Sequence, residues 1–113
     1  MLARVNRVVR ADDFRQTVRR GKRVSTPHAV IYVATRGIGE PTRFGFIVSK
    51  AVGNSVTRNL MTRRLRSIGH DVLAREGVGR DIVIRALPGS PEAKWSTLQG
   101  EIFDGLERNA SKR

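Results

Sequence analysis

Residues 55–74 carry a helical pattern that constrains the fold more than any other stretch of this chain. Their apolar side chains recur at spacings of four, three and four, on one narrow stripe of an α-helix: Met61, Leu65, Ile68 and Val72. A helix gains most of its stability by packing such a stripe against other elements. The pattern therefore predicts a long helix, from about Ser55 to Ala74, whose apolar stripe enters a hydrophobic core.

The side of this helix opposite the stripe is polar and mostly basic. It carries Asn59, Arg63, Arg66 and His70, while Arg58 and Arg64 flank the stripe. No acidic residue occurs between positions 40 and 71, so nothing nearby in the sequence neutralises these arginines. A solvated helix would normally mix charges, because opposite charges one turn apart stabilise it. Since guanidinium groups form paired hydrogen bonds with phosphate, we interpret this face as a nucleic-acid contact.

The charge of the whole chain indicates the same kind of partner. Its 113 residues include 22 Lys+Arg against 10 Asp+Glu, which gives a net charge of +12 and predicts a polyanionic partner. A membrane surface would instead require an exposed terminal helix with large apolar residues opposite its basic face. Here the best amphipathic helix is internal, and no run is apolar enough to span a bilayer. We therefore expect no membrane partner.

Two absences bear on the compartment. The residues from Met1 to Arg10 alternate bases with short aliphatic side chains and do not have the form of a signal peptide. The chain has no cysteine, which excludes disulfides and thiolate metal sites. Both observations are consistent with a cytoplasmic protein.

The other segments alternate between helix and strand patterns. Residues 11–21 predict a short helix, with acids in its first turn, arginines in its last turn and Gly21 just past its end. Apolar and β-branched runs predict strands at residues 22–26, 28–35, 43–49 and 81–87. The short connection at residues 36–42 predicts a hairpin-type loop, with the strand at 43–49 antiparallel to its predecessor. The apolar run of the last strand predicts a central position in the sheet.

A final helix completes the predicted order. It begins either near Ser90 or at Ser96, where Ser96-Thr-Leu-Gln99 has the form of a capping box. Its predicted buried stripe consists of Trp95, Leu98, Ile102 and Leu106. Gly77 and Gly79 end the basic helical region, and residues 109–113 are predicted to be a frayed basic tail. Without repeats or linkers, residues 1–113 predict one α+β domain with about four strands and three helices, in the order α-β-β-β-α-β-α.

The stretch that leads into the basic helix resembles the signature of the bacterial ribonuclease P protein component. It reads Lys50-Ala-Val-Gly-Asn-Ser-Val-Thr-Arg58-Asn59 and continues to Arg63 and Arg66. The family has an Arg-Asn-Arg motif on a helix, preceded by a Lys-x-x-Gly-Asn-x-x stretch. Here Leu60 replaces the last arginine of the motif, and Thr62 stands where a basic residue is common. Asn6-Arg7 and Asp13-Phe14 also match the family's N-terminal pattern, so the resemblance covers nearly the whole chain.

This resemblance implies a fold similar to that of ribosomal protein S5. An N-terminal helix packs on one face of a four-stranded sheet, and a βαβ unit carries the signature helix. The family's βαβ unit has a left-handed crossover, whereas the general rule for parallel strands predicts a right-handed one. The left hand is therefore an expectation from the resemblance alone.

The resemblance also implies an activity and its partners. Ribonuclease P is an endonuclease, a hydrolase that removes the 5′ leader of precursor tRNA during tRNA processing. Its RNA subunit would carry the hydrolysis, with Mg²⁺ bound mainly by that RNA and the substrate. The expected partners of this chain are therefore ribonuclease P RNA and precursor tRNA, within a ribonucleoprotein. No catalytic residue is assigned in the protein.

The signature helix would supply the first set of RNA contacts. The resemblance implies that Arg58, Arg63 and Arg66 contact RNA phosphates. Asn59 would orient this face or meet a hydrated metal ion bound to phosphate. Lys50 would add charge beside a cleft that receives the leader.

That cleft lies, in the family, between the first helix and the sheet, and aromatic residues line it. Phe14 and Tyr32 match two of the lining positions, while Val18 and Ala29 occupy places where aromatic residues are frequent. The single-stranded leader would stack on this floor, with Val18 and Ala29 contributing less than aromatic residues would. Composition alone favours a core role for Phe14 and Tyr32.

Two other kinds of function remain open on the residues. A small RNA-binding module of ribosomal-protein type would bind RNA and have no role in cleavage. A protein-only nuclease would need clustered carboxylates, or a nucleophile with a base beside it. Asp12-Asp13 fits better as charge at a helix N-terminus, Asp71 and Asp81 are isolated in the sequence, and neither histidine accompanies a nucleophile motif. The polypeptide is therefore not expected to be a catalyst by itself.

Overall fold

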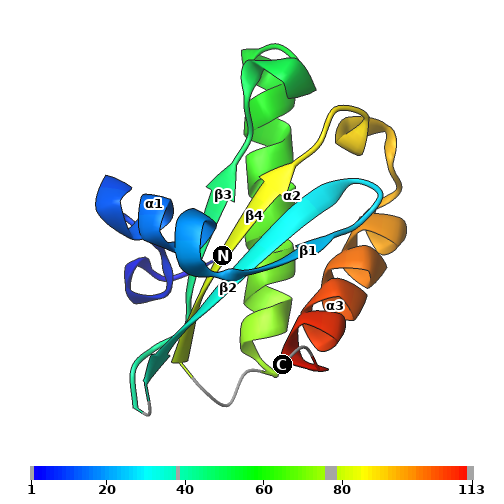
Figure 1. The fold of residues 1–113 in the computed structure, drawn as a ribbon. Helices are drawn as coiled ribbons and strands as arrows, with labels where there is room; N and C mark the ends of the chain where they lie inside the picture. The colour runs from blue at the N-terminus through cyan, green and yellow to red at the C-terminus, as the bar shows by residue number, and fades with distance from the viewer. Residues whose placement is uncertain (1, 38, 76–78, 112–113) are drawn as a thin grey trace.

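The computed structural model describes residues 2–37, 39–75 and 79–111, and there the predicted order of three α-helices and four strands is confirmed (Figure 1). The helices are α1 (Ala11–Arg20), α2 (Ser55–Leu73) and α3 (Trp95–Ser111). The strands are β1 (Lys22–Ser25), β2 (Ala29–Gly37), β3 (Arg43–Ile47) and β4 (Gly79–Ala86). Three 3₁₀ turns are η1 (Arg4–Asn6), η2 (Lys50–Val52) and η3 (Ser90–Glu92). Gly77 and the last two residues of the predicted tail lie outside the described residues.

The sheet has the strand order β1-β2-β4-β3, so the central position predicted for the last strand is confirmed. β4 pairs antiparallel with β2 and parallel with β3. The predicted hairpin between β2 and β3 is wrong: the two strands run in opposite directions, but β4 lies between them. Ile82, Val83 and Ile84 of β4 are fully buried, and such a two-sided apolar strand is covered best between two neighbours.

The connection from β3 through α2 to β4 has the left hand that the resemblance implies. In Figure 1 both strands run upward, α2 lies behind the sheet and β4 lies to the right of β3. A right-handed connection would place β4 on the other side of β3. Parallel strands in this chain therefore follow the exception to the general rule.

The larger core lies between the sheet and the two long helices, α2 and α3. The four apolar side chains predicted for the stripe of α2 are all buried, which confirms that prediction: Met61, Leu65, Ile68 and Val72. Leu98, Ile102 and Leu106 form the buried stripe of α3, but Trp95 is 40% exposed. Trp95 is the first residue of α3 and precedes the turn that packs on the sheet, so its predicted burial is wrong. No described helix is both long and apolar enough to cross a lipid bilayer.

The C-terminal end of α3 is ordered further than predicted. The helix continues to Ser111, and Asn109 is only 1% exposed. Its side-chain amide donates a hydrogen bond of 2.9 Å to the carbonyl oxygen of Lys22 in the edge strand β1. This long-range bond ties the last turns of α3 to the sheet, so the frayed tail predicted from residue 109 is wrong for residues 109–111, the part of it that the structure describes.

Replacing Asn109 by alanine should lower the free energy of unfolding by about 1–2 kcal/mol, because the part-buried hydrogen bond of a side chain that is only 1% exposed is lost. Urea unfolding followed by far-ultraviolet circular dichroism measures this change. Asn59→Ala is the matched control, since Asn59 is exposed on α2. Equal unfolding midpoints for the two variants would contradict the role given to Asn109.

A smaller apolar cluster lies on the other face of the sheet, beneath α1. Val30, Tyr32 and Val83 are buried there, and Phe14 and Ile47 pack against them. The ring of Phe14 rests on the backbone of β3. A Cβ atom added at Gly45 would lie only 2.5 Å from Phe14 Cε1, so the glycine permits this close approach. The two faces of the sheet are thus covered unequally, by two long helices on one side and one short helix on the other.

Candidate nucleic-acid interface

The start of α2 is built by a tight turn after η2. The side chain of Asn54 caps the helix by accepting a hydrogen bond of 2.9 Å from the backbone N–H of Thr57. Arg58 reaches back, and its Nε donates a hydrogen bond of 3.2 Å to the carbonyl oxygen of Gly53. Arg58 therefore helps to fix the turn and still presents the rest of its guanidinium group at the N-terminal end of α2.

The structure places the predicted contact residues of α2 at different depths. Asn59 and Arg63 are exposed, and Lys50 is exposed in η2. Arg66 is half-buried, and its Nε is buried without a hydrogen-bond partner. Its partial exposure still lets other parts of the side chain contact solvent. The roles predicted for these five residues stay predictions.

Two further positions on α2 modify this face. Arg64 has a structural contact: its Nη1 donates a hydrogen bond of 3.4 Å to the carbonyl oxygen of Pro91 in η3. Leu60, which replaces the last arginine of the family motif, is 38% exposed, and the neighbouring Val56 is 75% exposed. One border of the arginine face is therefore apolar rather than basic.

A shallow groove beside α1 has a volume of about 340 Å³. Phe14 and Val18 line it from α1 and Ile47 lines it from β3, while Arg15 and Arg19 stand at its rim. An apolar floor with a basic rim suits single-stranded RNA, whose bases stack and whose phosphates seek cations. Phe14 and Val18 were named from the sequence. Arg15 and Arg19 were not. Each directly follows one of these two residues, and this repeat one helical turn apart is the sequence signal that would have predicted the basic rim.

Tyr32 and Ala29, also named from the resemblance, lie elsewhere. Tyr32 is 6% exposed and belongs to the apolar cluster under α1, so it supports the groove from beneath. Ala29 is fully buried on the opposite face of the sheet, in the core with α2 and α3. Since successive strand residues alternate between faces, β2 cannot direct Ala29 and Tyr32 to the same side. The place given to Ala29 in the cleft is therefore wrong.

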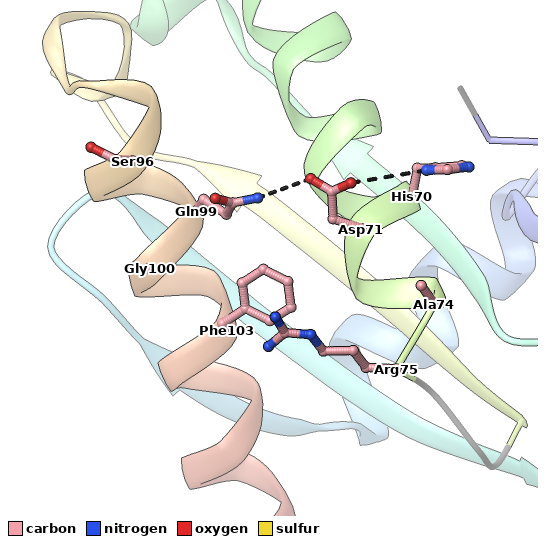
Figure 2. Close-up of a pocket in the computed structure, with 8 residues that line it drawn as sticks. All are labelled: His70, Asp71, Ala74, Arg75, Ser96, Gln99, Gly100 and Phe103. Carbon is pink, nitrogen blue, oxygen red and sulfur yellow. Dashed lines mark hydrogen bonds and ion pairs between the residues drawn. The ribbon is translucent and has the colours of Figure 1, made fainter.

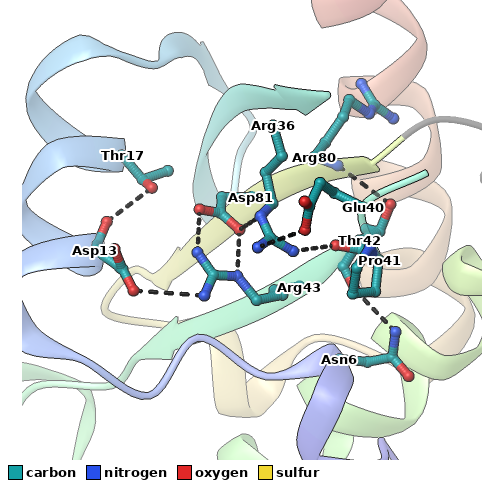
Figure 3. A network of polar contacts seen from close by, with 10 residues as sticks. All are labelled: Asn6, Asp13, Thr17, Arg36, Glu40, Pro41, Thr42, Arg43, Arg80 and Asp81. Carbon is teal, nitrogen blue, oxygen red and sulfur yellow. Dashed lines mark hydrogen bonds and ion pairs between the residues drawn. The ribbon is translucent and has the colours of Figure 1, made fainter. Parts of the chain in front are cut away.

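A network of ion pairs joins α1 to the sheet at one end of this groove (Figure 3). Arg43 binds Asp81 with two hydrogen bonds, of 2.8 Å from Nε and 2.7 Å from Nη2, and reaches Asp13 of α1 at 3.4 Å. Arg36 approaches Asp81 at 3.6 Å and Glu40 at 3.3 Å. Asp81 was isolated in the sequence but not in the fold. Asp13 supplies charge at the N-terminus of α1, as predicted, and also binds Arg43.

The pKa of the Arg43 guanidinium is raised, mainly by its hydrogen bonds to Asp81. Burial opposes this shift, and the electrostatic attraction of Asp81 and Asp13 adds to it. A raised pKa means that the stabilisation is complete below arginine's ordinary pKa and is lost only as the pH rises through the higher value. The guanidinium side of the network therefore keeps its charge throughout any working pH range.

A second hollow, of about 470 Å³, lies between α2 and α3 (Figure 2). Its polar groups are largely engaged with one another. Gln99 donates a hydrogen bond of 2.9 Å to Asp71, which lies 4.0 Å from His70, and Arg75 stacks at 4.4 Å over the ring of Phe103. Because a carboxylate lies in it and its arginine is engaged with an aromatic ring, this hollow fits a polyanion less well than the other two surfaces. Nowhere among the described residues do three His, Cys, Asp or Glu side chains gather as a metal site would require.

Comparisons with known proteins agree on one family. The family model described as Ribonuclease P matches residues 2–110. The ribonuclease P protein component of Clavibacter michiganensis is 48% identical over 108 residues, which is 96% of each chain. That of Pseudarthrobacter chlorophenolicus is 46% identical over 112 residues, covering 99% of this chain and 82% of the relative.

Solved structures support the same fold. The RNase P protein of Staphylococcus aureus superposes with a TM-score of 0.77 at 24% identity, covering 91% of this chain and 94% of that one. The RNase P protein of Thermotoga maritima gives a TM-score of 0.76 at 23% identity, covering 90% and 96%. At this level of identity, the likeness shows the shared arrangement of helices and sheet.

Proposed function

Since this chain belongs to the ribonuclease P protein family and acts as the protein subunit of ribonuclease P in tRNA processing, we propose that it holds two RNAs at once. The arginine face of α2 binds ribonuclease P RNA, and the groove beside α1 binds the 5′ leader of precursor tRNA. The observation that carries this proposal is their placement: α1 and α2 cover opposite faces of the sheet. One compact protein can therefore contact both polyanions without either blocking the other.

Each surface has the chemistry for its role. On α2, Arg58, Arg63 and Arg66 neutralise phosphates, and Asn59 orients that face or meets a hydrated metal ion. Lys50, in η2, adds charge beside the cleft that receives the leader. Release of counterions from the RNA would drive this association. In the groove, Phe14 offers an aromatic face to a leader base, and Arg15 and Arg19 border the track. A leader held in this way adds an anchor that positions the precursor for cleavage.

The hydrolysis is assigned to the RNA subunit, with Mg²⁺ held mainly by that RNA and by the substrate. Among the described residues, no three His, Cys, Asp or Glu side chains gather into a metal cluster. Mg²⁺ commonly keeps several waters and is held by few protein ligands together with phosphates, which agrees with an ion held mainly by RNA. The complex would work in the bacterial cytoplasm.

The decisive experiment measures 5′-leader cleavage of a precursor tRNA at low Mg²⁺ with the protein alone, a bacterial ribonuclease P RNA alone, and both together. We expect strong cleavage only in the combined reaction. Cleavage by the protein alone would mean a nuclease site in the polypeptide. An equal rate with and without protein would leave a ribosomal-type RNA-binding module as the better description.

Arg58→Ala and Arg66→Ala should each weaken binding of the RNA subunit and make it less sensitive to salt. Each lost phosphate contact lowers the slope of log affinity against log salt by about 0.7–0.9. Filter binding across a salt series measures this slope. Arg108→Ala is the control, because Arg108 is exposed on α3 and pairs with Asp104. Slopes for both α2 variants that equal the control would remove the assignment of this face.

A further inference from the structure

The N-terminal segment before α1 forms an additional edge on the sheet. The backbone N–H of Val8 donates a hydrogen bond of 2.8 Å to the carbonyl oxygen of Phe44, and Arg7 forms a parallel bridge with Phe44 in β3. The side chain of Asn6 donates a hydrogen bond of 2.9 Å to the carbonyl oxygen of Thr42. Leu2 and Val8 are buried, each 6% exposed. The backbone of this segment is therefore fixed before any ligand binds.

This segment walls a surface hollow of about 590 Å³, which we call the N-terminal arginine hollow. The arginines that line it are Arg4, Arg7, Arg10, Arg36 and Arg43. The hollow lies along the outer edge of β3 and shares no lining residue with the groove beside α1. It is therefore a separate basic surface from the two already described.

The five arginines divide into two kinds. Arg36 and Arg43 are neutralised by the carboxylates of the ion-pair network in Figure 3. Arg4, Arg7 and Arg10 have no carboxylate partner among the described residues, and Arg4 and Arg10 are exposed. Arg36 and Arg43 thus build the wall of the hollow, and the other three arginines supply its uncompensated charge.

Arg7 lies between the two exposed arginines in the sequence. Its side chain is half-buried, so it is partly accessible from the hollow that it lines. Three neighbouring like charges are costly, and an anion bound in the hollow would relieve that cost. Val5 and Val9 are each 59% exposed beside these arginines, and they offer apolar contact to sugars or bases. A ligand that is anionic at regular intervals and partly apolar matches this surface.

We propose that the N-terminal arginine hollow is a third RNA-binding site, in which Arg4, Arg7 and Arg10 bind successive phosphates of a phosphodiester backbone. The proposal rests on the proposed function, because it takes the RNA from the same complex. Two sources have this chemistry: the RNA subunit, and the part of the leader beyond the groove. Arg10 immediately precedes α1, which lines that groove, so a leader leaving it can reach the hollow.

The test compares two variants that each lose three positive charges. Arg4→Gln/Arg7→Gln/Arg10→Gln removes the free arginines and keeps Arg36 and Arg43. The matched control is Arg75→Gln/Lys94→Gln/Arg108→Gln, which changes the helical side of the molecule beyond the sheet. One arm measures binding of ribonuclease P RNA to the protein. The other measures binding of precursor tRNA with a long leader, and of mature tRNA, to the assembled holoenzyme. Both arms cover a salt series.

In the arm that contains the RNA bound by the hollow, the N-terminal variant should lower the slope of log affinity against log salt by about 2–3, relative to the control. Binding should weaken roughly 50-fold at 0.15 M salt. An effect in the first arm identifies the RNA subunit as the ligand. An effect confined to the precursor with a long leader identifies the leader. Losses no greater than those of the control in both arms would overturn the proposal.

A second variant and one reference reaction keep the result clear. If the triple variant does not fold, Arg4→Gln/Arg10→Gln changes only exposed side chains and should lower the slope by about 1.4–1.8. A value equal to that of the control would again overturn the proposal. Stimulation of cleavage by the unmodified protein tests the proposed function independently. If the protein stimulates cleavage but the N-terminal variant binds like the control, only the proposal for the hollow fails.

Discussion

Replacing Asp81 by asparagine should lower the free energy of unfolding by about 3 kcal/mol. Asp81 is 8% exposed and receives both hydrogen bonds of the Arg43 fork, with Arg36 also 3.6 Å away. The substitution leaves two guanidinium groups, whose side chains are only 20% and 21% exposed, without their shared carboxylate. Removing one partner of a buried ion pair typically costs about 3–5 kcal/mol, and the partial exposure of both arginines favours the lower end.

Urea unfolding at neutral pH measures this loss, and Asp104→Asn provides the control. Asp104 also pairs with an arginine, Arg108, but on the exposed surface of α3, where such a pair contributes about 0–1 kcal/mol. A double variant, Arg43→Met with Asp81→Leu, should recover much of the stability, because it removes both charges of the main pair together. A urea unfolding midpoint of Asp81→Asn equal to that of Asp104→Asn would show that the network does not stabilise the fold.

The Asp81 network also determines how firmly α1 is held. Arg43 links Asp81 in β4 to Asp13 in the first turn of α1. In the Asp81→Asn variant, hydrogen exchange of backbone amides should speed up more in α1 than in α2, relative to the unmodified protein. The reason is that the tie from Arg43 to Asp13 lies on the face of the sheet that α1 covers. The groove beside α1 would then lose its fixed shape, so the same substitution is expected to weaken leader binding as well as stability.

Replacing Phe14 by alanine should weaken the binding of precursor tRNA to the holoenzyme by about 1–3 kcal/mol, or roughly 5- to 150-fold, while mature tRNA binds as before. The ring of Phe14 is the aromatic surface that lines the groove, and Gly45 beneath it permits the ring to approach β3 closely. A leader base that stacks there loses its platform in the variant. Mature tRNA, which lacks the leader, does not use the groove.

Phe14→Leu separates stacking from packing, because it keeps apolar volume over Gly45 and removes the aromatic face. It should retain most of the stability and lose most of the leader-dependent affinity. Phe103→Leu is the matched control, since Phe103 is another half-buried phenylalanine but lies between α2 and α3 (Figure 2). If Phe14→Leu and Phe103→Leu bind a precursor with a leader equally well, the groove does not hold the leader.

The local parts of this fold follow from the sequence. The apolar spacing of α2 depends only on the helical period, so its buried stripe and its arginine face are predictable from one segment. The same is true of α1, with acids at its start and arginines at its end, and of the β-branched runs that form the strands. The charge of +12 and the signature from Lys50 to Arg66 indicate RNA and the family before any coordinates are known.

The tertiary structure decided what depends on distant partners. Whether β3 lies beside β2 or beyond β4 depends on which neighbours bury a two-sided apolar strand, and a short loop alone does not determine this. The register then places Tyr32 and Ala29 on opposite faces and brings Asp81 to Arg43, 38 residues away. The arginine hollow arises in the same way, because the N-terminal segment acquires its place only by pairing with Phe44. A local period specifies which face of an element is apolar, but only long-range pairing specifies what that face meets.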